Sequence, residues 1–162
     1  GHKRGSVFCG TLSKNGKLAA TGGEEDKAYV WDTSTGEIIL DCTGHKDSII
    51  FSAFNYDESY LATGDMSGLI QVWKVADKIK IQKITQESGI SKLVWKGNTT
   101  VLFSAGLDGI LRCFDGKNGQ CLRSFVAHTA DILDLYISEI ASNILSLNQL
   151  QSKNYWQIIT SD

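Results

Sequence analysis

A large aromatic residue recurs along the chain at Trp31, Trp73, Phe114 and Trp156, with intervals of 42, 41 and 42 residues. A second series runs in phase and lies 28 or 29 residues before each aromatic position: His2, His45, Gln86 and His128. Two series that share one period indicate an internal repeat, and about 40–45 residues is the length of a four-stranded blade of a β-propeller. The sequence therefore predicts an all-β fold.

The predicted domain covers residues 1–162 and contains four units, at residues 1–43, 44–85, 86–127 and 128–162. Short apolar segments separated by Gly, Asn, Asp and Ser indicate four strands in each of the first three units. In the first unit they are residues 6–12, 17–21, 28–32 and 38–42. The fourth unit keeps Trp156 in phase but loses its turn glycines, so residues 131–150 are also compatible with an amphipathic helix.

The predicted strands number four, four, four and three, and a blade buries its apolar faces only by stacking on neighbours. Because no spare strand lies at either end, we expect a part of a ring, a shortened ring, or an arc that associates with a second copy. Whether residues 137–162 form a blade stays open at this point.

Charge and motifs argue against several classes of function. There are 16 Lys and Arg against 18 Asp and Glu, so the net charge of −2 gives no general attraction to nucleic acid or anionic membranes. No apolar run reaches about 18 residues, which excludes a membrane-spanning helix. Nucleophile-elbow, phosphate-loop and HExxH patterns are absent, and the four cysteines form no CxxC pair. We expect no enzyme, no cofactor and no metal.

The remaining candidates for function lie in the loops between strands 2 and 3 and between strand 4 and the next strand 1. Such loops on a rigid scaffold are typical recognition sites. Carboxylates outnumber cations there, and Met66 and Leu107 add apolar surface, so the set predicts a site for a protein or peptide, and the acidic balance favours a basic one. The candidate residues are Lys3, Arg4, Glu24, Glu25, Lys46, Asp47, Asp65, Met66 and Asp131.

Five segments resemble the family of the angio-associated migratory cell protein, a WD-repeat family: TGGEEDKAYVW, GHKDSI, LATGDMSGLIQVW, AGLDGILRCFD and AHTADILDL. The resemblance extends from residue 1 to about residue 136, and it implies that middle blades of the family are missing between about Thr85 and Ser88. It implies a cytoplasmic, non-enzymatic protein linked to cell migration. A distant fungal relative implies the alternative of a chaperone for a basic ribosomal protein. A propeller fragment without function is a third possibility.

The repeat type also implies a structural role for the histidine and aromatic series. In such repeats the histidine bonds through a Ser or Thr to the Trp indole, and an Asp six residues before the aromatic orients it. That rule selects Asp108 alone, so the sequence predicts that no unit carries the full set. The structural residues are His2, Trp31, His45, Trp73, Asp108, Phe114, His128 and Trp156.

Overall fold

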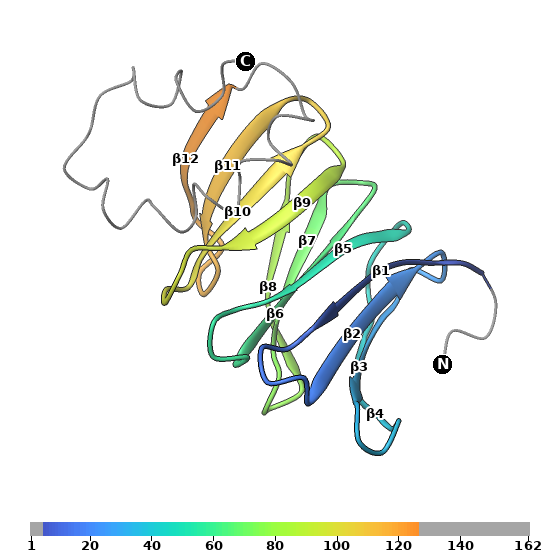
Figure 1. The fold of residues 1–162 in the computed structure, drawn as a ribbon. Helices are drawn as coiled ribbons and strands as arrows, with labels where there is room; N and C mark the ends of the chain where they lie inside the picture. Colours follow the sequence, from blue (N-terminus) through green and yellow to red (C-terminus); the bar gives the residue numbers. More distant parts are fainter. Residues whose placement is uncertain (1–4, 127–162) are drawn as a thin grey trace, which may run out of the picture.

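The computed structural model describes residues 5–126, which form three four-stranded antiparallel sheets and, within that range, no helix (Figure 1). We call the sheets blades 1, 2 and 3. Blade 1 contains β1 (Val7–Leu12), β2 (Leu18–Gly23), β3 (Ala28–Asp32) and β4 (Ile38–Cys42). Blade 2 contains β5 (Ile49–Phe54), β6 (Tyr60–Asp65), β7 (Leu69–Lys74) and β8 (Ile79–Thr85). Blade 3 contains β9 (Ile90–Trp95), β10 (Val101–Gly106), β11 (Ile110–Asp115) and β12 (Cys121–Val126).

The twelve strands confirm the all-β prediction and the four-strand plan of the first three units. In every blade the strands follow one another in chain order, each hydrogen-bonded to the next. The fourth unit, with Trp156 and the alternative helix at residues 131–150, lies outside the described residues.

The blades stack face to face in chain order along an arc (Figure 1). The first strands lie at the inner side, where β1 contacts β5 and β5 contacts β9. Meanders of this kind place the turns between strands 1 and 2 at one end of every blade. The loops between strands 2 and 3 lie at the other end, together with the connections from one blade to the next.

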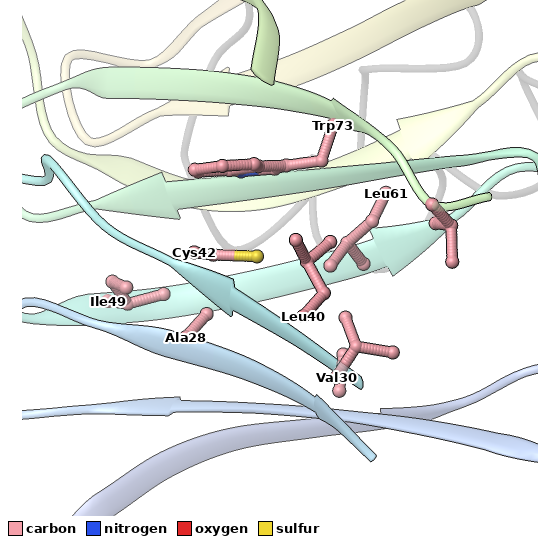
Figure 2. Packing of buried hydrophobic residues seen from close by; sticks show 9 residues of the cluster. Ala28, Val30, Leu40, Cys42, Ile49, Leu61 and Trp73 are labelled. Carbon is pink, nitrogen blue, oxygen red and sulfur yellow. The ribbon is translucent and has the colours of Figure 1, made fainter. Parts of the chain in front are cut away.

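Two apolar clusters hold the three blades together. Between blades 1 and 2, the side chains of Val30, Leu40 and Cys42 meet Leu61 and Trp73 (Figure 2). Between blades 2 and 3 the pattern repeats, and the buried residues are Ala62, Ile70, Val72, Ile84, Ile90, Leu93, Trp95, Leu102 and Phe114. Removing this apolar surface from water is the main force that stabilises the stack.

The cysteines belong to the strands and are free thiols. Cys42 and Cys113 are buried, Cys9 is partly buried, and Cys121 is exposed. Burial raises the pKa of the Cys42 thiol, and it raises that of Cys113 to about 11. Both buried thiols therefore stay protonated at neutral pH and act as small apolar side chains.

Candidate functional site

Five connections gather at one end of the blades, and we call them the upper loops: residues 24–27, 43–48, 66–68, 86–89 and 107–109. One hydrogen bond recurs in all three blades, from the first residue after strand 2 to a carbonyl just before strand 1. The backbone N–H groups of Glu24, Met66 and Leu107 donate to Ser6, Ser48 and Gly89, at 3.1, 3.0 and 3.0 Å. Glu24, Met66 and Leu107 therefore occupy equivalent positions.

Met66 and Leu107 form an exposed apolar pair across blades 2 and 3. Their side chains are 50% and 60% exposed. Both residues border Gly89, because a methyl group added there would meet the Met66 carbonyl and the Leu107 Cδ1 atom. A glycine at position 89 thus allows the two blades to bring these residues close together.

Acidic side chains lie on the same upper loops as this pair. Glu24, Asp26, Asp47, Glu87 and Asp108 are exposed. Glu25 is partly exposed, and the exposed cations of these loops are Lys27 and Lys46. The excess of carboxylates gives the loops a negative potential that favours cationic ligands. Glu87 was missing from the sequence-based candidates, although its place in the connection between two units was a sufficient signal.

A chain of buried hydrogen bonds runs under the upper loops of blade 2. His45 Nδ1 lies 2.8 Å from Asp65 Oδ2, and His45 Nε2 lies 2.7 Å from Thr63 Oγ1. The Trp73 indole N–H donates to the same Thr63 oxygen at 3.2 Å. Because a carboxylate only accepts, the network assigns a proton to Nδ1 of His45.

Asp65 belongs to this chain and not to the exposed loop surface. Its side chain is fully buried and also accepts hydrogen bonds from the backbone N–H groups of Ser67 and Leu69, at 2.9 and 3.0 Å. Burial would raise the pKa of this carboxyl group, but the hydrogen bonds from His45, Ser67, Leu69 and Lys46 outweigh it and lower the pKa to about 2.

Two sequence-based interpretations are thereby corrected. Asp65 is unavailable to a partner, and blade 2 does carry a full set of His45, Thr63, Asp65 and Trp73. The rule of an Asp six residues before the aromatic missed Asp65, because Asp65 lies eight residues before Trp73. It is the last residue of β6 and contacts the histidine from there.

Blade 3 replaces that chain with a shorter one. The Ser104 hydroxyl donates to Gln86 Oε1 at 2.7 Å, and Gln86 Nε2 donates to the Ser88 carbonyl at 3.0 Å. Phe114 is buried, but its side chain has no N–H group that could donate a hydrogen bond to Ser104. Asp108 bonds to Arg112 at 2.8 Å on the partly exposed surface, which differs from the orienting role predicted for it.

Blade 1 is described in part. The Trp31 indole N–H donates to Thr21 Oγ1 at 2.8 Å, as the repeat predicts. The Glu24 carboxylate turns back and accepts from the Ser6 N–H at 2.9 Å. In the loop that leads from blade 1 to blade 2, the Asp47 carboxylate accepts a hydrogen bond from the Ser48 N–H at 2.7 Å. The other candidates lie outside the described residues: His2, Lys3, Arg4, His128, Asp131 and Trp156.

A shallow cleft lies at the opposite end of blades 2 and 3. It has a volume of about 440 Å³ and is lined by polar residues of three turns, among them Tyr56, Asn98 and Lys117. Within residues 5–126, no group of three or more His, Cys, Asp or Glu side chains is placed to hold a metal ion. No helix in the described part of the chain is long and apolar enough to cross a membrane.

Comparisons with known proteins agree with this architecture. The family described as "WD domain, G-beta repeat" matches residues 1–32 and 36–74, and the "Anaphase-promoting complex subunit 4 WD40 domain" matches residues 67–141. The human angio-associated migratory cell protein is 41% identical over 117 residues, which cover 72% of this chain and 27% of that protein. The mouse serine-threonine kinase receptor-associated protein is 32% identical over 119 residues, covering 71% of this chain and 33% of that protein. The chain thus spans about a quarter to a third of the length of these relatives.

Solved structures show the same fold at lower identity. The WD40 repeats of RRP9 superpose with a TM-score of 0.73 and 20% identity, covering 79% of this chain and 40% of that one. U3-55K superposes with the same TM-score and identity, covering 79% and 41%.

Proposed function

Because the chain belongs to the WD-repeat family, we propose that it is a non-enzymatic scaffold that binds a protein segment through the upper loops. The observation that carries this proposal is the exposed pair of Met66 and Leu107 on either side of Gly89. Methionine and leucine on a rigid loop platform provide apolar area that a partner's side chain buries.

The charges of the upper loops favour a basic partner segment. Asp47 lies in the loop that enters blade 2, Glu87 in the loop that enters blade 3, and both are exposed. Opposite charges at the rim of an interface mainly increase the rate of association and select the partner. We therefore propose a segment with an apolar centre and flanking Lys or Arg residues.

Basic ribosomal proteins are one partner class with this chemistry, and an assembly role for the chain is the second candidate function. The excess of carboxylates on the upper loops supports it. Co-sedimentation with newly made ribosomal proteins, lost at high salt, is expected for this role. A role in cell migration, and a cytoplasmic location, rest on the resemblance to the angio-associated migratory cell protein.

The test uses a fluorescein-labelled peptide in which lysines flank leucines, and its counterpart with glutamates in place of the lysines. We expect the chain to bind the lysine peptide more tightly in fluorescence anisotropy. Replacing Met66 and Leu107 together by serine is expected to weaken that binding by about tenfold or more. The double variant Asp47→Lys, Glu87→Lys is also expected to bind the lysine peptide more weakly than the wild type. The loss in affinity is expected to grow as the salt concentration is lowered, because charge repulsion is then screened less.

Tyr56→Ser is the matched control, because Tyr56 is 48% exposed and lies at the opposite end of the blades. It is expected to leave peptide binding unchanged. Equal binding of both peptides, or equal loss in the Tyr56 and the loop variants, would contradict binding through the upper loops.

A further inference from the structure

Blade 1 carries a charged residue at the position where blades 2 and 3 carry apolar ones. The recurring backbone hydrogen bond to the residue before strand 1 makes Glu24 equivalent to Met66 and Leu107. All three residues are exposed. The equivalent positions of the upper loops are therefore acidic, apolar and apolar from blade 1 to blade 3.

Neighbouring blades approach each other in the same way at this end of the strands. A Cβ atom added at Gly22 in β2 would lie 2.6 Å from Ile49 Cγ2 in β5. One added at Gly64 in β6 would lie 3.0 Å from Ile90 Cγ2 in β9. In both contacts a glycine of strand 2 allows the first isoleucine of the next blade to come close. Because the contact repeats along the arc (Figure 1), the three equivalent positions follow one another at similar intervals.

The Glu24 carboxylate is held in place over the entry to β1. It accepts a hydrogen bond from the Ser6 N–H at 2.9 Å. A Cβ atom at Gly5 would lie 2.7 Å from Glu24 Oε2, so the glycine leaves room for the carboxylate. Leu107 leans the same way, because its Cδ1 atom borders Gly89 at the entry to β9. A side chain that is already positioned loses less conformational freedom when a partner binds.

The carboxylates beside the apolar pair of blades 2 and 3 are buried or paired. Asp65 is fully buried and bonds to His45. Asp108 forms an ion pair with Arg112 at 2.8 Å. By contrast, the donor to Glu24 is a backbone N–H, which carries no net charge, so this carboxylate keeps its negative charge at the surface. Among the three equivalent positions, the charge thus lies at the blade 1 end.

We propose that Glu24 determines the order of side chains in the bound segment: a Lys or Arg lies over blade 1, and two apolar side chains lie over blades 2 and 3. This inference rests on the function proposed above and adds the place of the charge. A cationic group over Glu24 gains an opposite charge. The same group over Met66 would lose hydration against apolar surface. The preferred segment therefore has its basic residue at one end of an apolar pair.

Two fluorescein-labelled peptides of identical composition test the order by fluorescence anisotropy on the full chain. One carries a lysine at the end, before two leucines, and the other carries the lysine between the leucines, with the same serine spacers. We expect the wild type to bind the end-lysine peptide about tenfold more tightly. The other peptide would place a leucine against the Glu24 carboxylate and an ammonium group against the apolar pair.

Glu24→Gln keeps an oxygen that can accept from the Ser6 N–H and removes the charge. It is expected to weaken binding of the end-lysine peptide about threefold to fivefold, and to leave the central-lysine peptide within about twofold. Asp47→Asn is the matched control, because Asp47 is also an exposed carboxylate of the upper loops but lies outside the equivalent positions. It is expected to change binding of both peptides by the same factor.

The double variant Met66→Ser, Leu107→Ser separates failure of this inference from failure of the proposed function. Suppose that this variant weakens both peptides, but Glu24→Gln weakens them equally or the wild type binds them equally. The order would then be overturned, while binding through the upper loops would stand. If the double variant binds both peptides as the wild type does, or if the wild type binds neither, the proposed function fails and this inference fails with it.

Discussion

Blades 2 and 3 have the same strand plan but different interiors. Blade 2 contains the buried chain of His45, Asp65, Thr63 and Trp73, with every link between 2.7 and 3.2 Å. Blade 3 contains Gln86 and Ser104, joined by one side-chain hydrogen bond, and Phe114 in place of tryptophan. Nevertheless Trp73 and Phe114 are buried to the same degree, at 5% and 4% exposed.

The comparison separates two contributions to the fold. Apolar contacts between neighbouring blades are common to both and are sufficient to place the strands. The polar chain is an addition that ties the loop before β5 to the middle of blade 2. Such a chain stabilises only when each member is satisfied, because an unpaired buried polar group is costly.

The largest difference between the two blades is expected in the loss of free energy of unfolding when an aspartate of each is removed. Asp65→Ala removes a buried carboxylate and leaves several donors unpaired, so we expect a loss of about 3–4 kcal/mol in the free energy of unfolding. Asp108→Ala removes a partly exposed pair with Arg112 and is expected to cost about 1 kcal/mol or less. Urea unfolding of both variants measures the difference. Equal losses would show that the polar chain of blade 2 contributes no more than a surface ion pair.

The same carboxylate predicts that the free energy of unfolding depends on pH. The pKa of Asp65 is about 2 in the folded chain and about 4 when unfolded, so its ionised form favours the folded state. This contribution, about 2 kcal/mol, is complete above about pH 4 and is lost as pH falls through 2. We expect the stability difference between wild type and Asp65→Asn to shrink between pH 5 and 2, and a difference independent of pH would contradict the assignment.

A smaller difference in the free energy of unfolding is expected when the hydroxyl group at the centre of each network is removed. Thr63 links His45 to Trp73, so Thr63→Val is expected to cost about 2 kcal/mol. Ser104 has one side-chain partner, Gln86, and Ser104→Ala is expected to cost about 1 kcal/mol. Thermal unfolding of the two variants ranks them, and the reverse order would mean that the Gln86 bond is the stronger restraint.

The smallest effects are expected where the two blades are most alike. Met66 and Leu107 occupy equivalent exposed positions, and alanine at either is expected to change the free energy of unfolding by about 0.5 kcal/mol or less. Denaturant titration of both variants checks this. A larger loss would mean that the pair packs within the scaffold and does not form an open surface.

Much of the fold was predictable because it depends on local patterns. The period of the aromatic series, the short apolar strands and the glycine turns predicted the twelve strands and the ends at which the loops lie. Gly68 illustrates the turns: its φ is +92°, a left-handed backbone conformation that favours glycine. These features depend on residues close in sequence.

The candidate site was less predictable, because burial decides which polar residues face a partner. Met66 and Asp65 are adjacent in the sequence, yet one is 50% exposed and the other fully buried. A rule based on one spacing selected Asp108 and missed Asp65, because the carboxylate in blade 2 approaches the histidine from the strand end.

The sequence alone therefore determined the repeat and the strand order, since a period of about 42 residues and alternating apolar positions follow from the chain itself. Only the tertiary structure decided that Asp65 bonds to His45 and that Met66 and Leu107 both border Gly89. The first contact lies within blade 2 and the second joins blades 2 and 3, and both bring together residues that are far apart in the chain.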